Sequence, residues 1–208
     1  NKLKKFGLVI IGAHIGVHLF KDINDYKDQN ILLVEPVPHN LKQLKKNTAE
    51  YKNVIIDPCA VGDKKKINDF YFVKGDSIHK LGKHWASGIG SFSKKHILEH
   101  RTKRFKIQES DIDSIKIQTL TFLDLIKKYK ISEIDKLQID VEGYEFAILN
   151  SIDYSIKINK IIFESKHFDG TFNEGPKLNE IKNKLIKNNY NIVQLDKENI
   201  LAKKTTFD

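Results

Sequence analysis

Short apolar runs alternate along the chain with longer segments in which apolar residues recur at the period of a helix. The runs are Leu8 to Ile11, Ile31 to Val34, Val54 to Ile56, Leu137 to Val141 and Ile161 to Phe163. This alternation is typical of a parallel sheet wrapped by helices, so the pattern predicts an α/β fold.

The segments between and after these runs predict four helices, over residues 15–26, 39–51, 121–129 and 176–188. Thr119 or Thr121 suits the N-cap of the third helix, and Pro176 suits the first turn of the fourth. Near the end of the chain, residues 190–195 and 199–203 are separated by three polar residues and predict a closing antiparallel hairpin.

Residues 62–114 do not follow this rhythm, because glycines interrupt most of the segment. We expect a strand over residues 68–73 and a helical turn over residues 94–100. An insertion of this length in a compact fold is typically a lid or a binding loop. We therefore interpret residues 1–208 as one domain, in which residues 62–114 contact the substrate.

The composition distinguishes a folded globular protein from membrane-spanning, secreted and disulfide-bonded proteins. Of the 208 residues 40% are hydrophobic and 30% are charged, which indicates a folded globular chain. No apolar run approaches the length of about 18 to 20 residues that spans a bilayer, and the first residues turn polar too soon for a signal peptide. A lone Cys59 excludes an internal disulfide and any multi-cysteine metal site, and it suits a small buried side chain. We expect a cytoplasmic protein.

The formal net charge of +9 raises nucleic acid as a partner. Of the 36 basic residues, however, only Arg101 and Arg104 are arginines. Arginine supplies the planar fork that reads phosphates and bases, so a charge made of lysines favours a solvated surface over nucleic-acid binding.

A small-residue turn, Gly12-Ala13-His14-Ile15-Gly16, follows the first predicted strand. Such a turn lets a ligand approach backbone amides where a helix begins. Glu35 ends the second strand, where an acidic side chain can accept both hydroxyls of an adenosine ribose. The glycine patterns of dinucleotide-binding and P-loop proteins are absent, so the turn and Glu35 predict another adenosine ligand.

Two further strand ends carry acidic residues. Asp140 and Glu142 follow a buried strand and would point to the same face while the chain stays extended. Glu164 and His167 follow the next strand, at the same sheet edge, and form a candidate acid or base pair. The alternative for the first pair is a helix cap with a surface acid.

The segment His96-Ile97-Leu98-Glu99-His100 matches the inverted zinc-protease motif H-x-x-E-H. On a helix its two histidines would share a face, but the stretch is rich in lysine and shows no third ligand downstream in a suitable setting. We therefore interpret these histidines as solvated and expect no metal site.

The ordered series GAHIG, LLVEPVPHN, CAVGD, LTFLDLI, LQIDVEGYE and IIFESKH resembles the FkbM family of S-adenosylmethionine-dependent methyltransferases, from about Leu8 to Lys203. The resemblance implies a Rossmann-like class I methyltransferase fold. In that fold a seven-stranded, mostly parallel sheet has an antiparallel last strand and helices on both faces. It also implies O-methylation of a sugar, a glycan or a related metabolite, with S-adenosylhomocysteine as the product.

The resemblance assigns site residues by position. It places Gly12, Ala13, His14 and Gly16 at the methionine portion of the cofactor, Glu35 and Pro36 at the ribose, and Cys59, Ala60 and Val61 beside the adenine. Asp140 and Glu142 would face the methionine end and the acceptor, and the proton acceptor would be Asp140, Glu142, Glu164 or His167. Trp85, Ser87 and Ser91 belong to a loop that could cover the acceptor.

One position departs from the family pattern, which usually has an acid two residues before the first glycine, where this chain has Ile10. Without that carboxylate, we expect weaker cofactor binding or compensation by a neighbouring acid. Two alternatives therefore remain beside the sugar methyltransferase: a binding module without turnover, which Ile10 motivates, and an RNA methyltransferase, which the positive charge motivates.

Overall fold

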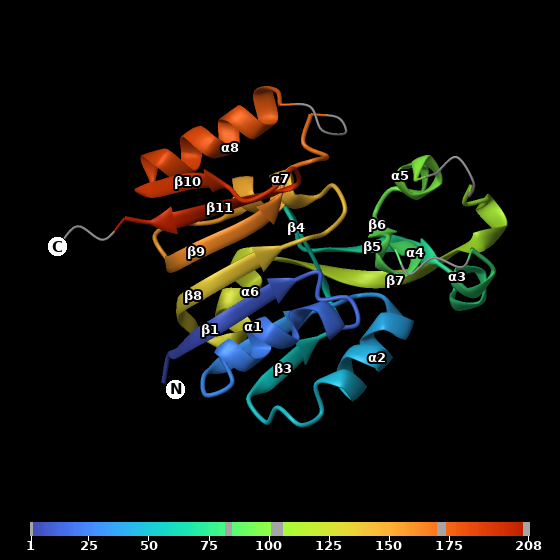
Figure 1. The fold of residues 1–208 in the computed structure, drawn as a ribbon, viewed down its shortest axis with the longest axis horizontal. Coiled ribbons are helices and arrows are strands. Elements are labelled where there is room, and N and C mark those ends of the chain that lie inside the picture. The colour runs from blue at the N-terminus through green and yellow to red at the C-terminus, as the bar shows by residue number, and fades with distance from the viewer. Residues whose placement is uncertain (1, 82–84, 101–105, 170–173, 206–208) are drawn as a thin grey trace.

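The computed structural model describes residues 2–81, 85–100, 106–169 and 174–205. Its main sheet has seven strands in the order β10-β11-β9-β8-β1-β2-β3 (Figure 1). The strands are β1 (Lys4–Ile11), β2 (Asn30–Val34), β3 (Val54–Asp57), β8 (Ile131–Ile139), β9 (Lys157–Glu164), β10 (Tyr190–Gln194) and β11 (Asn199–Lys204). The last strand, β11, inserts between β10 and β9 and runs antiparallel to both. The fold class and the closing hairpin are therefore confirmed.

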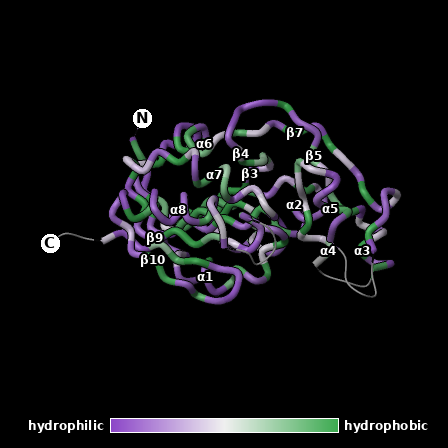
Figure 2. Tube along the Cα trace, turned by 90° about the horizontal axis from the view of Figure 1, so that it is seen from above, coloured by the Kyte–Doolittle hydropathy of each residue, from purple (hydrophilic) through white to green (hydrophobic). Residues whose placement is uncertain are grey.

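The alternation of side chains along β1 divides the core into two layers. Val9 and Ile11 face the layer covered by α6 (Phe122–Tyr129), α7 (Glu145–Ser151) and α8 (Pro176–Lys187). Leu8 and Ile10 face the layer formed with η1 (Val17–Leu19), α1 (Phe20–Asp25) and α2 (Pro38–Asn47). Figure 2 shows the hydrophobic colour along the strands inside and the hydrophilic colour along much of the outside. Both faces of the sheet are thus covered, as the apolar runs predict.

The predicted insertion is organised around a second sheet. Its four strands have the order β4-β7-β5-β6, with β4 (Ala60–Gly62), β5 (Lys66–Val73), β6 (Gly90–Ser91) and β7 (Ile112–Thr121). The short helices α3 (Gly75–Leu81), α4 (Trp85–Gly88) and α5 (Lys94–Glu99), with η2 (Glu109–Asp111), accompany it beside the main sheet (Figure 1). The strand predicted over residues 68–73 is present, whereas β7 was not predicted, although its partly alternating burial is typical of a half-exposed strand.

Capping residues explain several element boundaries. Thr121 caps α6, since its hydroxyl accepts from the Asp124 amide and Asp124 accepts from the Thr121 amide in return. Pro176 begins α8, as predicted. The helix predicted over residues 15–26 begins later, because Gly16 takes a left-handed conformation with φ of 79°. None of the helices in the described ranges is long and apolar enough to cross a membrane.

Candidate active site

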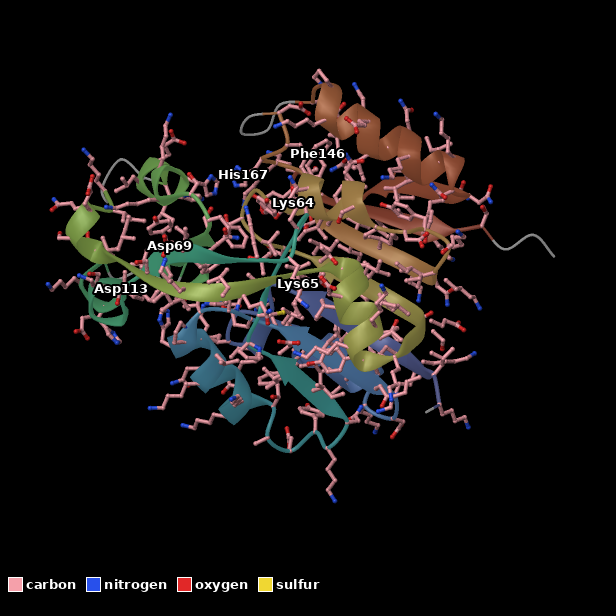
Figure 3. All side chains as sticks on the ribbon, turned by 180° about the vertical axis from the view of Figure 1, so that it is seen from behind. Lys64, Lys65, Asp69, Asp113, Phe146 and His167 are labelled. Atoms are coloured by element: carbon pink, nitrogen blue, oxygen red, sulfur yellow. The ribbon has the colours of Figure 1, made fainter. Side chains whose placement is uncertain are left out.

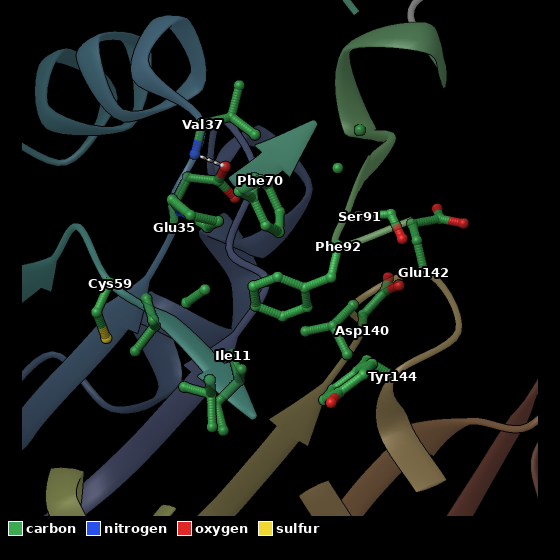
Figure 4. Close-up of a pocket in the computed structure, with 18 residues that line it drawn as sticks. Ile11, Glu35, Val37, Cys59, Phe70, Ser91, Phe92, Asp140, Glu142 and Tyr144 are labelled. Atoms are coloured by element: carbon green, nitrogen blue, oxygen red, sulfur yellow. Dashed lines mark hydrogen bonds between the residues drawn. The ribbon is translucent and has the colours of Figure 1, made fainter. Parts of the chain in front are cut away.

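A cavity lies where β1, β2 and β8 end, at the carboxyl edge of the main sheet (Figure 4). The predicted residues on its wall are Gly12, Glu35, Pro36, Cys59, Ala60, Val61, Ser91, Asp140 and Glu142. The fold thus brings predicted residues as far apart in the chain as Gly12 and Glu142 onto the wall of one cavity.

Gly12 is fixed by the close approach of another strand end. Its φ is +90°, and a Cβ built there would lie 1.7 Å from the carbonyl oxygen of Asp140. The Gly12 and Ala13 amides both donate to the Val34 carbonyl at 3.0 Å, and the Gly16 amide donates to the Ala13 carbonyl. These amides do not point to a ligand as predicted, because the protein itself satisfies them. The turn therefore contributes shape and close packing to the cavity.

Glu35 is buried at the end of β2 and binds the turn directly. One carboxylate oxygen accepts from the His14 amide at 2.8 Å, and the other accepts from the Val37 amide at 2.9 Å. Burial raises the pKa of Glu35 to about 7, although these amides and the Asn40 side chain favour its charged form. Oε1, which accepts from Val37, also accepts from the Asn40 side chain at 3.5 Å, so Oε2 is the oxygen that can still accept a hydroxyl donor from the cavity.

Ile10 occupies the position at which the family pattern has an acid, and its side chain is fully buried. It packs in the layer with Leu8, Ile31 and Leu33, while its neighbour Ile11 lines the cavity. An apolar side chain therefore completes the core at this position, and the acids on the cavity wall are Glu35, Asp140 and Glu142.

Asp140 and Glu142 reach the cavity by a different geometry from the one predicted. The strand ends at Ile139, and Glu142 takes a left-handed conformation with φ of 52°, so the pair does not alternate along an extended chain. Asp140 opens onto the cavity, where lost solvation and then the charge of Glu142 raise its pKa to about 6. An ionised Asp140 can therefore accept a proton at neutral pH.

Glu145, whose role the sequence analysis did not identify, holds this turn in place. Its carboxylate accepts from the Val141 amide at 2.8 Å and from the Gly143 amide at 3.0 Å. Burial raises the pKa of Glu145 to about 8. The acidic residue that follows IDVEG is thus a positioning residue, because it stabilises the left-handed conformations at Glu142 and Gly143.

The segment from Cys59 to Val61 forms a mostly apolar stretch of the wall. Asp57 holds its start, because one carboxylate oxygen accepts from the Cys59 amide and the other accepts from Lys128 and Tyr129. Burial and the nearby Asp57 raise the pKa of the Cys59 thiol. Cys59 is therefore a neutral packing residue, as predicted.

Three aromatic rings form the wall on the side of the second sheet. The Phe92 ring lies 5.2 Å from that of Phe70 and 5.3 Å from that of Tyr144, in edge-to-face contacts. Phe70 and Tyr144 were not predicted as site residues, because they occupy a strand and a turn whose relation to Glu35 depends on the tertiary fold. Their position shows that the second sheet completes the cavity (Figure 4).

A second cavity adjoins the first. Both are lined by Ser91, Phe92, Glu142 and Tyr144, and the second also reaches His96 and Glu99. Two adjoining cavities with a shared wall can hold two reactants whose reacting atoms meet at the boundary.

The remaining predicted residues lie around these cavities. Ala13 and Gly16 are buried in the turn, and the His14 ring bonds the Ser87 hydroxyl at 2.6 Å. Ser87 thus joins α4 to the turn that follows β1. Trp85 begins α4, but its side chain lies outside the described residues.

Glu164 and His167 lie near the same sheet edge, behind Glu142. Lys166 pairs with Glu164 at 2.5 Å, and the His167 ring lies 3.8 Å from the Glu142 carboxylate. Burial and then the charge of Lys166 lower the pKa of His167 to about 4. His167 is therefore a neutral imidazole at physiological pH.

The prediction that His96 and His100 are solvated is wrong. His100 lies 3.4 Å from the Glu142 carboxylate, and the His96 ring packs 5.4 Å from that of His167. The sequence could not show this, because the insertion folds back onto the main sheet and brings α5 to His167.

Comparison with known proteins gives one family. The family model for the methyltransferase FkbM domain matches residues 11–192. No curated protein matches the chain significantly in sequence.

Solved structures with a similar fold include methyltransferases. Precorrin-6y C5,15-methyltransferase from Geobacter metallireducens is 11% identical, with a TM-score of 0.48, over 98% of this chain and 82% of its own. N-methyltransferase NodS from Bradyrhizobium japonicum is 10% identical, with a TM-score of 0.43, over 98% of this chain and 88% of its own. The family match covers most of the sequence, and the chain belongs to the FkbM family of S-adenosylmethionine-dependent methyltransferases.

Proposed function

We propose that this protein transfers a methyl group from S-adenosylmethionine to a hydroxyl of a sugar, a glycan or a related hydroxylated metabolite. The observation that carries the proposal is the shared wall of the two cavities, which combines the Glu142 carboxylate, the Ser91 hydroxyl and the rings of Phe92 and Tyr144. Carboxylates and hydroxyls bond sugar hydroxyls, and aromatic rings pack against the apolar faces of a sugar.

The first cavity suits the cofactor. Glu35 borders one part and would accept the ribose hydroxyls, the stretch from Cys59 to Val61 would contact the adenine, and Asp140 borders the part near Gly12. Carboxylates can accept the hydroxyls of a nucleoside and attract a cationic centre, and apolar walls can contact its base. When bound, the cofactor supplies an electrophilic methyl group on a sulfonium.

The protein's own part in the reaction is to orient the acceptor, exclude water and receive one proton. Asp140 is the best proton acceptor on the cavity wall, because it is near the boundary and its pKa of about 6 leaves it ionised at neutral pH. Phe92 and Tyr144 would hold the acceptor ring against the boundary. Attack by the acceptor oxygen forms a carbon–oxygen bond as the carbon–sulfur bond breaks, and the hydroxyl proton passes to Asp140.

The charge at this boundary disfavours a polynucleotide acceptor. Asp140 and Glu142 would repel phosphates, and the net positive charge of the chain comes almost entirely from lysines. RNA therefore serves as the contrasting substrate in the test.

The test measures transfer of a labelled methyl group to a panel of nucleotide sugars, free glycans and RNA, with wild type and Asp140→Asn. Wild type should methylate at least one sugar. The variant should lose about 10²-fold or more in turnover, and this loss should exceed its loss of cofactor affinity. Methylation of RNA alone, or full turnover by Asp140→Asn, would contradict the proposal.

A further inference from the structure

Three histidines and one glutamate meet where the insertion contacts the main sheet. His96 lies in α5, His100 is the C-cap of that helix, Glu142 follows β8 and His167 follows β9. One side-chain nitrogen or oxygen from each of the four lies within 4.8 Å of the others. Figure 3 shows His167 on the side of the main sheet that faces α5. We call these four residues the histidine–glutamate cluster.

The spacing in the cluster is close to that of a metal site. A tetrahedral zinc ion with bonds of 2.0 to 2.1 Å holds its ligand atoms about 3.3 Å apart. In the cluster, Nε2 of His100 and of His167 lie 3.4 Å and 3.8 Å from Oε2 of Glu142. The ring centres of His96 and His100 are 4.7 Å apart. Small side-chain rotations would therefore bring all four atoms to bonding distance.

Three polar atoms of the cluster are buried and have no hydrogen-bond partner among the residues that the structure describes. They are Nε2 of His96, Nε2 of His167 and Oε2 of Glu142. A buried polar atom that lacks a partner costs about 1 to 3 kcal/mol, and native proteins contain few of them. Three such atoms that converge on one point therefore call for a shared partner.

The backbone sets the orientation of His100. Its Nδ1 lies 2.9 Å from the His96 carbonyl, which can only accept, so Nδ1 carries a proton and Nε2 faces Glu142. A hydrogen bond of this kind on the second nitrogen is what orients histidines that bind metals. The distance of 3.4 Å from Nε2 to Glu142 is longer than the 2.7 to 2.9 Å that is usual for a charge-assisted bond.

A proton or a metal ion could occupy the space between these atoms, and the geometry distinguishes them. A proton bridges two atoms, so protonation of His100 would serve Glu142 and leave His96 and His167 without partners. A metal ion accepts a lone pair from all four groups at once. Lys166, a cation near the cluster in the described part of the chain, is already paired with Glu164 at 2.5 Å and with Glu198 at 3.5 Å, so its charge is compensated.

We propose that the histidine–glutamate cluster binds one divalent transition-metal ion, of which zinc is the representative, through His96, His100, His167 and Glu142. Three imidazole nitrogens and one carboxylate oxygen suit zinc, cobalt and related ions better than magnesium or calcium, which prefer oxygen ligands. The ion joins α5 of the insertion to the loops after β8 and β9, beside the second cavity. This proposal does not depend on the methyltransferase activity.

The experiment uses the full chain after treatment with a chelator, without cofactor. Calorimetric titration with zinc measures affinity and stoichiometry, and titration with cobalt measures the visible absorption of a four-coordinate ion. The variants are His96→Ala and His167→Ala, and the matched control is His79→Ala, which changes an exposed histidine in α3. Far-UV circular dichroism shows whether each variant is folded, and His167→Asn replaces any variant that is not.

We expect one zinc ion per chain, tetrahedral cobalt absorption, and affinity at least tenfold weaker in the cluster variants but unchanged in His79→Ala. Zinc should also raise the melting temperature of wild type more than that of His167→Asn. A folded wild type that takes up neither ion would overturn the proposal. So would equal binding by wild type and the cluster variants, since the ions would then bind elsewhere.

Discussion

The first cavity and the histidine–glutamate cluster lie at the same edge of the main sheet, but their polar groups are satisfied differently. Around the cavity, Glu35 bonds two backbone amides, and the Gly12 and Ala13 amides share the Val34 carbonyl. In the cluster, one buried side-chain atom each of His96, His167 and Glu142 has no hydrogen-bond partner among the described residues. The first region is complete without a ligand, and the second gains its missing partners from one.

This contrast has a physical origin in the chain. The cavity wall comes mainly from strand ends of the main sheet, which parallel hydrogen bonds hold in register. The cluster joins the sheet to α5, a six-residue helix in the insertion. A rigid scaffold can preorganise polar groups, whereas a short connecting element needs a further contact to fix it.

The largest expected effect tests the rigidity of the first region. Gly12→Ala places a methyl group against the Asp140 carbonyl, and alanine tolerates the positive φ poorly. We expect the free energy of unfolding, measured by urea denaturation, to fall by about 3 to 5 kcal/mol. Gly75→Ala is the matched control, because a Cβ there meets nothing within 4 Å, and it should change stability by less than about 1 kcal/mol. Equal stability of the two variants would show that the turn can relax.

The second prediction concerns the buried charge of Glu35. Its pKa is 4.5 when exposed and about 7 in the folded protein, so the unfolded chain releases this proton at a lower pH than the folded protein does. Glu35 therefore makes its full contribution to the free energy of unfolding below about pH 4.5. This contribution falls by about 3 kcal/mol as the pH rises to about 7. Urea denaturation from pH 4.5 to 8 should show a flatter profile for Glu35→Gln. Identical profiles would mean that Glu35 stays ionised in the folded protein.

The third prediction separates the two regions by ligand. Glu35→Ala should weaken binding of S-adenosylmethionine by about 1 to 3 kcal/mol, because the ribose hydroxyls lose their acceptor. The same variant should bind zinc as wild type does, while His167→Ala should bind the cofactor as wild type does. Calorimetry with each ligand measures both effects. A loss of both ligands in either variant would show that the two regions form one coupled site.

The sequence predicts the first region better than the second, because strand ends of a parallel sheet build the first and a short helix of the insertion contributes to the second. Apolar runs identify the parallel strands, and the residues that follow a run must lie at one sheet edge, so Glu35 and Asp140 could be placed. The contact between α5 and His167 depends on how an irregular insertion folds back, which no periodicity encodes. Glu145 was missed for a different reason, because an acidic side chain that bonds backbone amides resembles an ordinary residue of a helix first turn.

The smallest expected effect concerns Ser87, which lies in α4 of the insertion. Its hydroxyl bonds the ring of His14, in the turn after β1, at 2.6 Å. Its backbone carbonyl also accepts from Asn40 of α2, so α4 is held to that helix even without the hydroxyl. Ser87→Ala should therefore weaken cofactor binding by only about 1 kcal/mol. A double-mutant cycle with His14→Ala, measured by calorimetry, should give a coupling energy of similar size. A coupling energy near zero would show that α4 covers the turn after β1 without stabilising it. The insertion and this turn would then contribute independently to cofactor binding.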